Sequence, residues 1–296
     1  MSIPVIDAHQ HIWRHADLPW LSGPMVPRIF GPYEPIRRDY PITEFIADIA
    51  GSGVVKSVYV QANVAPDGAE KEVAYVQAAA DESGWPHGIV GYADLTADDV
   101  RPALDRLMRY PLLRGIRMQI HWHEKETYRF ARRPDLADDP AFRRNFAALA
   151  DYGLAFELQV FAKQMAGAAR LAADFPATTF VLQHCGMPED LSESGMAGWR
   201  DGMALLAKEA NVVAKLSGLG TFIHRNDAAH IERICKETIA LFGPSRCLYG
   251  SNFPIEKIWT EYSPLIGAFR AALANYSPSE QDDMFHNVAA RVYRLG

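Results

Sequence analysis

The sequence predicts an α/β protein, a (β/α)8 TIM barrel that occupies residues 1–296 as one domain, with long loops at its C-terminal mouth. Eight short runs of β-forming residues recur along the chain, and segments of helical composition separate most of them. Strands that alternate with helices at this spacing pair in parallel through right-handed crossovers. Eight such units close a barrel, and 296 residues is a usual length for this fold.

The strand segments follow one another from the start of the chain almost to its end. They are 3–13, 55–63, 87–95, 113–122, 154–161, 179–186, 212–220 and 246–255. Helices are expected between them over 68–83, 97–110, 139–153 and 162–176, with a short one near 43–50.

Three longer segments interrupt the alternation. They are 14–41, which is rich in Pro, Gly and aromatic residues, 123–139 and 186–200. Connections of this length inside a barrel are usually lids or binding loops. Because all three follow strands, we expect them at the C-terminal mouth, where barrel enzymes build their sites.

Composition narrows the classes of partner. The chain is 49% hydrophobic and 22% charged, with a formal net charge of −6 and acidic and basic residues interspersed. This balance argues against nucleic acid or an anionic membrane as the main partner. No leader or membrane-spanning run is apparent, so we expect a cytoplasmic protein. Cys185, Cys235 and Cys247 lack the spacing of a disulfide or zinc framework and are expected to be buried thiols.

Alternation along the strands predicts which side chains face the barrel lumen. In 113–122, Ile116, Met118 and Ile120 form an apolar set that belongs against the helices, so the opposite set faces inward. The inward set of this strand is Arg117, Gln119 and His121. The same test turns Asp7, His9, His11, Glu157, Gln159, Lys215 and Ser217 inward.

The same alternation groups Tyr59 with Gln61 and Asn63, Leu182 with His184, and Leu248 with Gly250 and Asn252. A barrel lumen normally holds branched apolar side chains, so this many polar groups need a ligand or mutual hydrogen bonds. A single histidine is more often structural, but the set His9, His11, His121 and His184 favours a polar pocket at the mouth. Gln119 and Ser217 are expected to bridge strands.

Several sequence blocks resemble those of a known family. "IDAHQHIW", "DLPWL", "GIVGYADL", "LRGIR", "QHCG" and "YGSNFPIEK" occur in the order seen in the amidohydrolase superfamily. Within it, the chain resembles the amidohydrolase-related (amidohydrolase 2) family, which includes L-fuconolactonase and 2-pyrone-4,6-dicarboxylate lactonase. The resemblance implies the barrel fold and a hydrolase acting on a carboxylic ester bond.

The resemblance also implies a reaction centre. It places His9, His11, His184 and residue 252 around the reacting atoms. His9, His11 and His184 would hold one divalent metal ion, Zn or Mn, that acidifies a water and polarises a carbonyl. Some members of the lactonase branch work without metal, so a metal-independent site is the other expectation. Gln159 is a poor metal ligand, which argues against a two-metal site.

Asn252 departs from the family pattern, which has Asp at this position. A carboxylate there takes the proton of the attacking water, and an amide has no basic lone pair for this task. One reading gives the role of base to Glu256 or Glu157, and a second gives it to His121 or His123. In a third reading the protein has lost hydrolysis. We favour the first, with Glu256 as base, and Glu256 otherwise pairs with Lys257.

Basic residues indicate the substrate class. In the resembling lactonases the arginine of the "GIR" block, here Arg117, helps to hold the substrate. A guanidinium suits bidentate capture of a carboxylate. Further substrate contacts are expected from His121, Lys215, Gln61 and Gln159, with added positive charge from Arg132, Arg133 and Arg225 and aromatic walls from Trp13, Trp20 and Tyr33. Trp122 is expected to pack outward.

We therefore expect a hydrolase that opens a small lactone bearing a carboxylate or several hydroxyl groups, such as a sugar-acid lactone or an intermediate of aromatic degradation. An amidohydrolase-type decarboxylase and a non-catalytic small-molecule binding protein are the alternatives, because Asn252 replaces the usual Asp. The expected partner is an anionic or polyhydroxylated small molecule. The sequence leaves open whether the chain forms a homo-oligomer.

Overall fold

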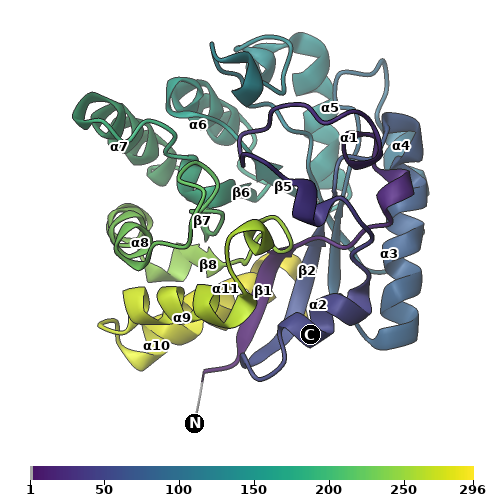
Figure 1. The fold of residues 1–296 in the computed structure, drawn as a ribbon. Helices are drawn as coiled ribbons and strands as arrows, with labels where there is room; N and C mark the ends of the chain where they lie inside the picture. Colours follow the sequence, from purple (N-terminus) through teal and green to yellow (C-terminus); the bar gives the residue numbers. More distant parts are fainter. Residues whose placement is uncertain (1–2) are drawn as a thin grey trace.

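The fold was analysed in a computed structural model that describes residues 3–296. Eight parallel strands follow one another in chain order around one sheet, and helices surround it (Figure 1). The strands are β1 Val5–Gln10, β2 Val54–Val60, β3 Gly88–Gly91, β4 Leu113–Ile116, β5 Ala155–Leu158, β6 Phe180–Leu182, β7 Val212–Leu216 and β8 Cys247–Tyr249. The predicted (β/α)8 barrel is confirmed.

The end of β1 and the segment after β8 close the barrel at its C-terminal mouth. Asn252 N donates to His9 O at 2.7 Å, and His11 N donates to Phe253 O at 2.8 Å. These two bonds join the first histidine-bearing segment to the segment that contains Asn252. The closure therefore brings together the two parts of the chain that the sequence singled out, although they are far apart in sequence.

The helices connect the strands on the outside of the barrel, and the predicted helices are all present with bounds shifted by a few residues. Those in the described part of the chain are α1 Pro19–Ser22, α2 Ile42–Asp48, α3 Ala69–Ser83, α4 Arg101–Leu107, α5 Pro140–Asp151, α6 Met165–Asp174, α7 Glu193–Ala207, α8 Ala228–Phe242, α9 Tyr262–Leu273, α10 Pro278–Asp282 and α11 Val288–Tyr293.

Two apolar clusters stabilise the barrel. The larger lies between the strands and the outer helices. The smaller fills the lumen, with small or branched side chains from every strand except β4, and α11 packs onto it from the N-terminal end. Its strand members are Ile6, Ala8, Val58, Val60, Val90, Ala155, Val181, Val213 and Leu248. This apolar floor leaves the polar residues of the lumen nearer the C-terminal mouth.

The alternation test is confirmed for β4, β5 and β7. Ile116, Phe156 and Leu216 belong to the outer cluster. The residues that alternate with them, such as Arg117 and Gln159, line a cavity at the mouth.

The test was wrong for Asp7. Ile6 and Ala8, expected outside, fill the lumen, and the Asp7 carboxylate accepts a hydrogen bond from Tyr262 of α9 at 2.9 Å on the outer side. The register between β1 and β2 shifts between Asp7 and Gln10. An extra residue in one strand inverts the side-chain alternation that follows it. Asp7 therefore faces outward, while His9 and His11 reach the mouth.

Two further predictions on the second half of the chain need correction. Strand β6 ends at Leu182, and His184 and Cys185 have left-handed backbone φ angles of 53° and 49°. This turn directs His184 into the mouth, although Leu182 packs in the outer cluster. The segment 186–200 is also not a loop throughout, because α7 begins at Glu193. Ser192 caps α7 by accepting from Gly195 N at 3.1 Å.

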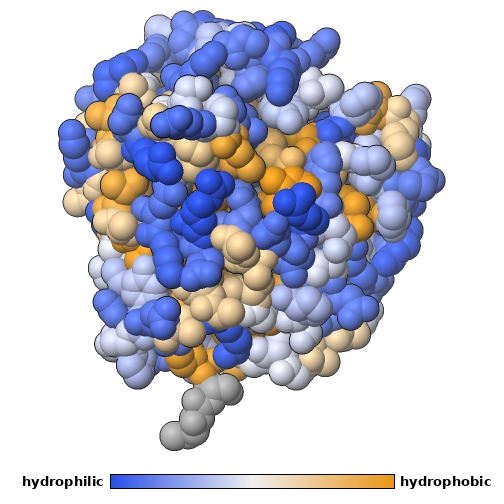
Figure 2. Space-filling view, turned by 60° about the vertical axis from the view of Figure 1, so that its left-hand side comes forward, coloured by the Kyte–Doolittle hydropathy of each residue, from blue (hydrophilic) through white to orange (hydrophobic). Residues whose placement is uncertain are grey.

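The surface is mixed. Figure 2 shows a face on which hydrophilic residues predominate and hydrophobic residues are scattered in small groups. Within residues 3–296, no helix has the length and hydrophobicity needed to cross a membrane. Cys185, Cys235 and Cys247 are buried free thiols, as predicted.

Candidate active site

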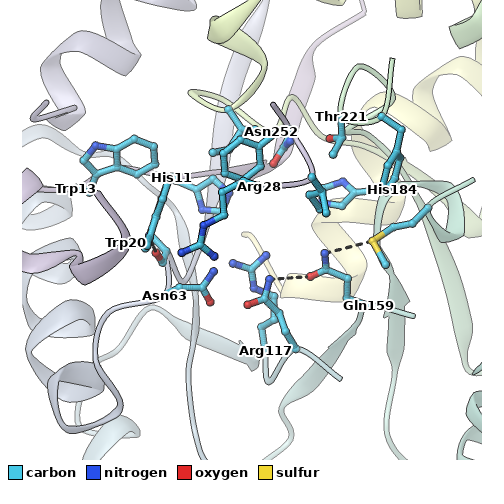
Figure 3. Close-up of a pocket in the computed structure, with 17 residues that line it drawn as sticks. His11, Trp13, Trp20, Arg28, Asn63, Arg117, Gln159, His184, Thr221 and Asn252 are labelled. Atoms are coloured by element: carbon cyan, nitrogen blue, oxygen red, sulfur yellow. Dashed lines mark hydrogen bonds between the residues drawn. The ribbon is translucent and has the colours of Figure 1, made fainter. Parts of the chain in front are cut away.

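A cavity of about 90 Å³ opens at the C-terminal mouth (Figure 3). Its walls come from the ends of strands and from the long segment between β1 and α2. The lining residues are His11, Trp13, Trp20, Arg28, Ile29, Phe30, Ala62, Asn63, Arg117, Gln119, Gln159, His184, Met187, Thr221, Phe222, Asn252 and Ile255. Two arginines and two histidines are among them, and none of these lining residues is Asp or Glu.

The structure brings His9, His11 and His184 together. The ring centroid of His9 lies 5.0 Å from that of His11 and 4.7 Å from that of His184. All three side chains are buried. Gly250 and Gly218 allow this close packing. A Cβ on Gly250 would lie 2.7 Å from His9 Cβ, and a Cβ on Gly218 would lie 2.3 Å from His184 Nδ1.

Hydrogen bonds orient two of the three rings. His11 Nδ1 donates to the Val60 carbonyl at 2.6 Å, which leaves the lone pair of the neutral ring on Nε2. His184 Nδ1 lies 2.9 Å from Ser217 Oγ, so Ser217 orients this ring, as an inward-facing Ser217 can. Both ring nitrogens of His9 are buried without a hydrogen-bond partner. His9 is therefore a polar group that a ligand is needed to satisfy.

The histidines are neutral in this environment. Burial, followed by the charges of Arg117 and neighbouring groups, lowers the pKa of His11 to about 3. Burial and the nearby Lys215 ammonium hold the pKa of His9 well below its usual range. Burial and Arg117 do the same for the pKa of His184. Neutral imidazoles offer lone pairs to a cation or to the proton of a hydroxyl group.

Lys215 and Glu157 form a buried ion pair beneath the histidines. Lys215 Nζ lies 2.7 Å from Glu157 Oε2, and both side chains are fully buried. Glu157 also accepts from Gln183 Nε2 at 2.9 Å and from the Tyr293 hydroxyl. Neither partner lines the cavity. The expected contact of Lys215 with substrate therefore stays a prediction, and the structure shows instead an ammonium that acts on His9 through its charge.

Arg117 extends from the end of β4 into the cavity. Its guanidinium donates to the Gln61 carbonyl and, at 3.4 Å, to Gln183 Oε1, while its buried Nε has no partner. Burial lowers the pKa of Arg117 to about 10, opposed by the charges of Glu157 and Glu72. The group remains cationic near neutral pH.

Asn252 stands between the cavity and Glu256. Asn252 lines the cavity and has a left-handed φ of 61°, and its carbonyl accepts from Glu256 N at 3.2 Å. Glu256 is fully buried; its Oε2 accepts from Trp259 Nε1 at 2.8 Å, and its Oε1 has no partner. Burial raises the pKa of Glu256 to about 7, opposed by the hydrogen bond from Trp259.

The other predicted substrate contacts lie at different depths. Gln159 lines the cavity, where its Oε1 accepts from Gln119 Nε2 at 3.1 Å. Gln61 is buried behind the cavity wall and donates to Asn63 Oδ1 at 3.2 Å. His121 is packed between Phe130 and Phe161, and its ring is not part of the lining. For Gln61 and His121, direct contact with substrate stays a prediction.

The source of the positive charge differs from the expectation. Arg133 pairs with Asp135 at 2.6 Å, and Arg225 pairs with Asp227 at 3.0 Å, all on the surface. Neither of these arginines lines the cavity, and nor does Arg132. Arg28, which sequence reasoning missed, supplies the second guanidinium. Its only signal in the sequence was its place in the long segment 14–41, from which Trp20 and Tyr33 were identified as expected walls.

The histidine cluster was tested as a metal site. Within residues 3–296, no three His, Cys, Asp or Glu side chains are arranged so that they could hold a metal ion. The individual rings have suitable donor chemistry, because His9 has two orphaned buried nitrogens and His11 keeps a lone pair on Nε2, but their present arrangement with His184 is not that of a three-ligand site. The Val60 carbonyl bonded to His11 is the kind of outer partner that orients a metal-binding ring.

Comparison with known proteins places the chain in a family. The profile of a family described as amidohydrolase matches residues 6–295. The chain belongs to the amidohydrolase family. The chain is 37% identical to the uncharacterized protein y4mH of Sinorhizobium fredii, with 99% of each chain covered. It is 29% identical to an L-fucono-1,5-lactonase of Burkholderia multivorans, over 98% of this chain and 96% of the relative.

The solved structures agree with this assignment. An amidohydrolase of Burkholderia multivorans with bound zinc superposes with a TM-score of 0.82 at 27% identity, covering 99% of this chain and 100% of the other. The predicted membership in the amidohydrolase family is therefore confirmed, as is the barrel that the resemblance implied.

Proposed function

We propose that the protein is a hydrolase that opens the ring of a small lactone carrying a carboxylate or several hydroxyl groups. The observation that carries the proposal is a cluster of neutral histidines with unsatisfied ring nitrogens at a cavity lined by His11, His184 and Asn252, with Glu256 buried behind Asn252. The lactonase named among the relatives supports the same reaction class.

In the proposed reaction, water attacks the lactone carbonyl and Glu256 accepts its proton through one further water molecule. A base with a pKa near the working pH is the most effective, and Glu256 has a pKa of about 7. Glu256 Oε1 is free to accept, whereas Lys215, Gln183 and Tyr293 already occupy the oxygens of Glu157. Among the two carboxylates considered, the contacts therefore favour Glu256.

The remaining residues hold the substrate and the developing charge. Arg117 is assigned to holding the substrate, and the one N–H that each neutral ring of His9 and His184 carries is assigned to stabilising the oxyanion when no metal ion is bound. His11 Nε2 carries a lone pair, so His11 accepts a hydrogen bond from a water or a substrate hydroxyl rather than donating one to an oxyanion. A single divalent ion, when bound by His9, His11 and His184, supplies Lewis-acid polarisation of the carbonyl.

The test is proton release from a panel of sugar-acid lactones and unsaturated lactones of aromatic degradation, with the His184→Asn variant beside the wild type. Wild type should acidify the medium with at least one lactone, and His184→Asn should lose that activity while its circular dichroism is unchanged. His286→Asn, on the C-terminal helices outside the cavity, is the matched control and should keep full activity.

Two results would overturn the proposal. One is carbon dioxide release from an aromatic acid by the wild type without hydrolysis of any lactone, which would make the protein a decarboxylase. The other is tight binding of a lactone with no turnover, which would make it a binding protein that lost its base at Asn252.

A further inference from the structure

We propose that Arg28 and Arg117 together clamp one carboxylate of the substrate, so that the site selects anionic lactones over neutral polyhydroxylated ones. This inference rests on the proposed function, and it narrows the two substrate classes to one.

The charge of the cavity wall is the first argument. Arg28 and Arg117 both line the cavity, and its lining contains no Asp or Glu. Of the ion pairs found within residues 3–296, none involves Arg28 or Arg117. Arginines at a protein surface commonly pair with carboxylates, as Arg133 and Arg225 do here. Glu157 and Glu72 act on Arg117 only through their charge, so two guanidiniums that face one cavity without a directly paired carboxylate indicate that the anion comes from the ligand.

Unsatisfied donors are the second argument. The Nε atoms of Arg28 and Arg117 are both buried without a hydrogen-bond partner. Figure 3 shows both guanidinium groups and the Asn63 amide turned toward the cavity. Because Asn63 Oδ1 accepts from Gln61 Nε2 at 3.2 Å, the Asn63 amide nitrogen is the atom left for a ligand. Three sets of N–H donors therefore line one cavity, where a carboxylate can accept from them.

Arg28 is held in place although it lies in a long connecting segment. Its guanidinium carbon lies 5.8 Å from the centroid of the Trp20 ring, and Trp20 Nε1 donates to the Ala62 carbonyl at 2.8 Å. On the other side, His224 Nε2 lies 3.1 Å from the Ile29 carbonyl. Contacts with both the β2 end and the segment after β7 thus fix the backbone next to Arg28, and the clamp is formed before the ligand arrives.

A neutral ligand would leave this arrangement unsatisfied. Hydroxyl groups can accept from the arginines, but they bring no negative charge to offset the two guanidiniums that line the cavity. A carboxylate accepts charge-assisted hydrogen bonds from both, which are about twice as strong as neutral ones. The discrimination therefore depends on charge rather than on the shape of the ring.

The experiment uses two pairs of matched probes. The first pair is 5-oxotetrahydrofuran-2-carboxylate and its carboxamide, both lactones, followed by proton release. The second pair is the corresponding lactam carboxylate and lactam carboxamide, which are not opened and whose binding is measured by calorimetry. Wild type should prefer the carboxylate in each pair by at least tenfold. Arg28→Gln should reduce kcat/KM or affinity for the carboxylates tenfold to a hundredfold and change the carboxamides less than twofold.

Arg132→Gln is the control, because it removes the same charge from an exposed residue outside the cavity lining, and it should leave both preferences unchanged. Equal binding of carboxylate and carboxamide by the wild type, or an unchanged preference in Arg28→Gln, would overturn the clamp. If the lactam carboxylate binds through Arg28 but the wild type opens no lactone in the wider panel, the clamp stands and the proposed hydrolysis fails. If the wild type opens only neutral lactones, the proposed hydrolysis stands and the clamp fails.

Discussion

Replacing Lys215 by Met would leave the Glu157 carboxylate without its cation in the barrel lumen. The two charged atoms lie 2.7 Å apart, and neither side chain is exposed. At an effective dielectric constant of about 20, their attraction is roughly 6 kcal/mol. The hydrogen bonds from Gln183 and Tyr293 to Glu157 remain in the variant and offset part of the loss. We expect Lys215→Met to lower the free energy of unfolding by about 3–5 kcal/mol.

Urea unfolding followed by circular dichroism measures this loss, and the chain offers a matched control. Lys163 and Glu124 are also 2.7 Å apart, but their side chains are 77% and 55% exposed. Solvent screens such a pair, so Lys163→Met should unfold at nearly the wild-type urea concentration. The double variant Lys215→Met with Glu157→Gln should recover much of the stability, because the amide carries no charge. Equal losses for Lys215→Met and Lys163→Met would refute the reasoning from burial.

Two other predictions concern the mouth of the barrel. Because burial raises the pKa of Glu256 to about 7, kcat/KM should rise with pH and level off above about 7, and Glu256→Gln should be slow and lack this rise. Stability changes in the opposite direction. Because the pKa of Glu256 is raised in the folded state, wild type should lose stability relative to Glu256→Gln as the pH increases from about 4.5 to 7. If the unfolding free energies of the two proteins change in parallel with pH, this prediction is contradicted. In Gly218→Ala, the new Cβ would lie 2.3 Å from His184 Nδ1 at a backbone φ of +61°, so hydrolysis should fall at least a hundredfold with the fold retained. Gly153→Ala is the control, because Gly153 has a similar φ of +62° but open space around it. Wild-type activity in both variants would show that His184 tolerates displacement.

The sequence alone determined the architecture and much of the inward-facing set. The alternation of strands and helices is a local property, so the eight strands and the helices between them could be predicted from composition. The period of two also identified Arg117, Gln159 and Lys215 as inward, because β5 and β7 pair without a register shift and the shift between β3 and β4 lies before Gly115. It failed at Asp7, where a register shift between β1 and β2 inverts the alternation. It also does not apply to His184, where the backbone leaves the strand.

The tertiary structure decided which inward residues reach the cavity and which serve beneath it. Lys215 and Gln159 have the same predicted orientation, yet Lys215 pairs with Glu157 at depth and Gln159 lines the cavity. Depth along the barrel depends on strand stagger and on the filling of the lumen by α11, which no local pattern contains. Arg28 enters the cavity because contacts with distant residues fix the segment 14–41 over the mouth. The placement of Glu256 behind Asn252 likewise depends on the packing of the segment after β8, so burial, which the sequence does not specify, sets the pKa of the proposed base.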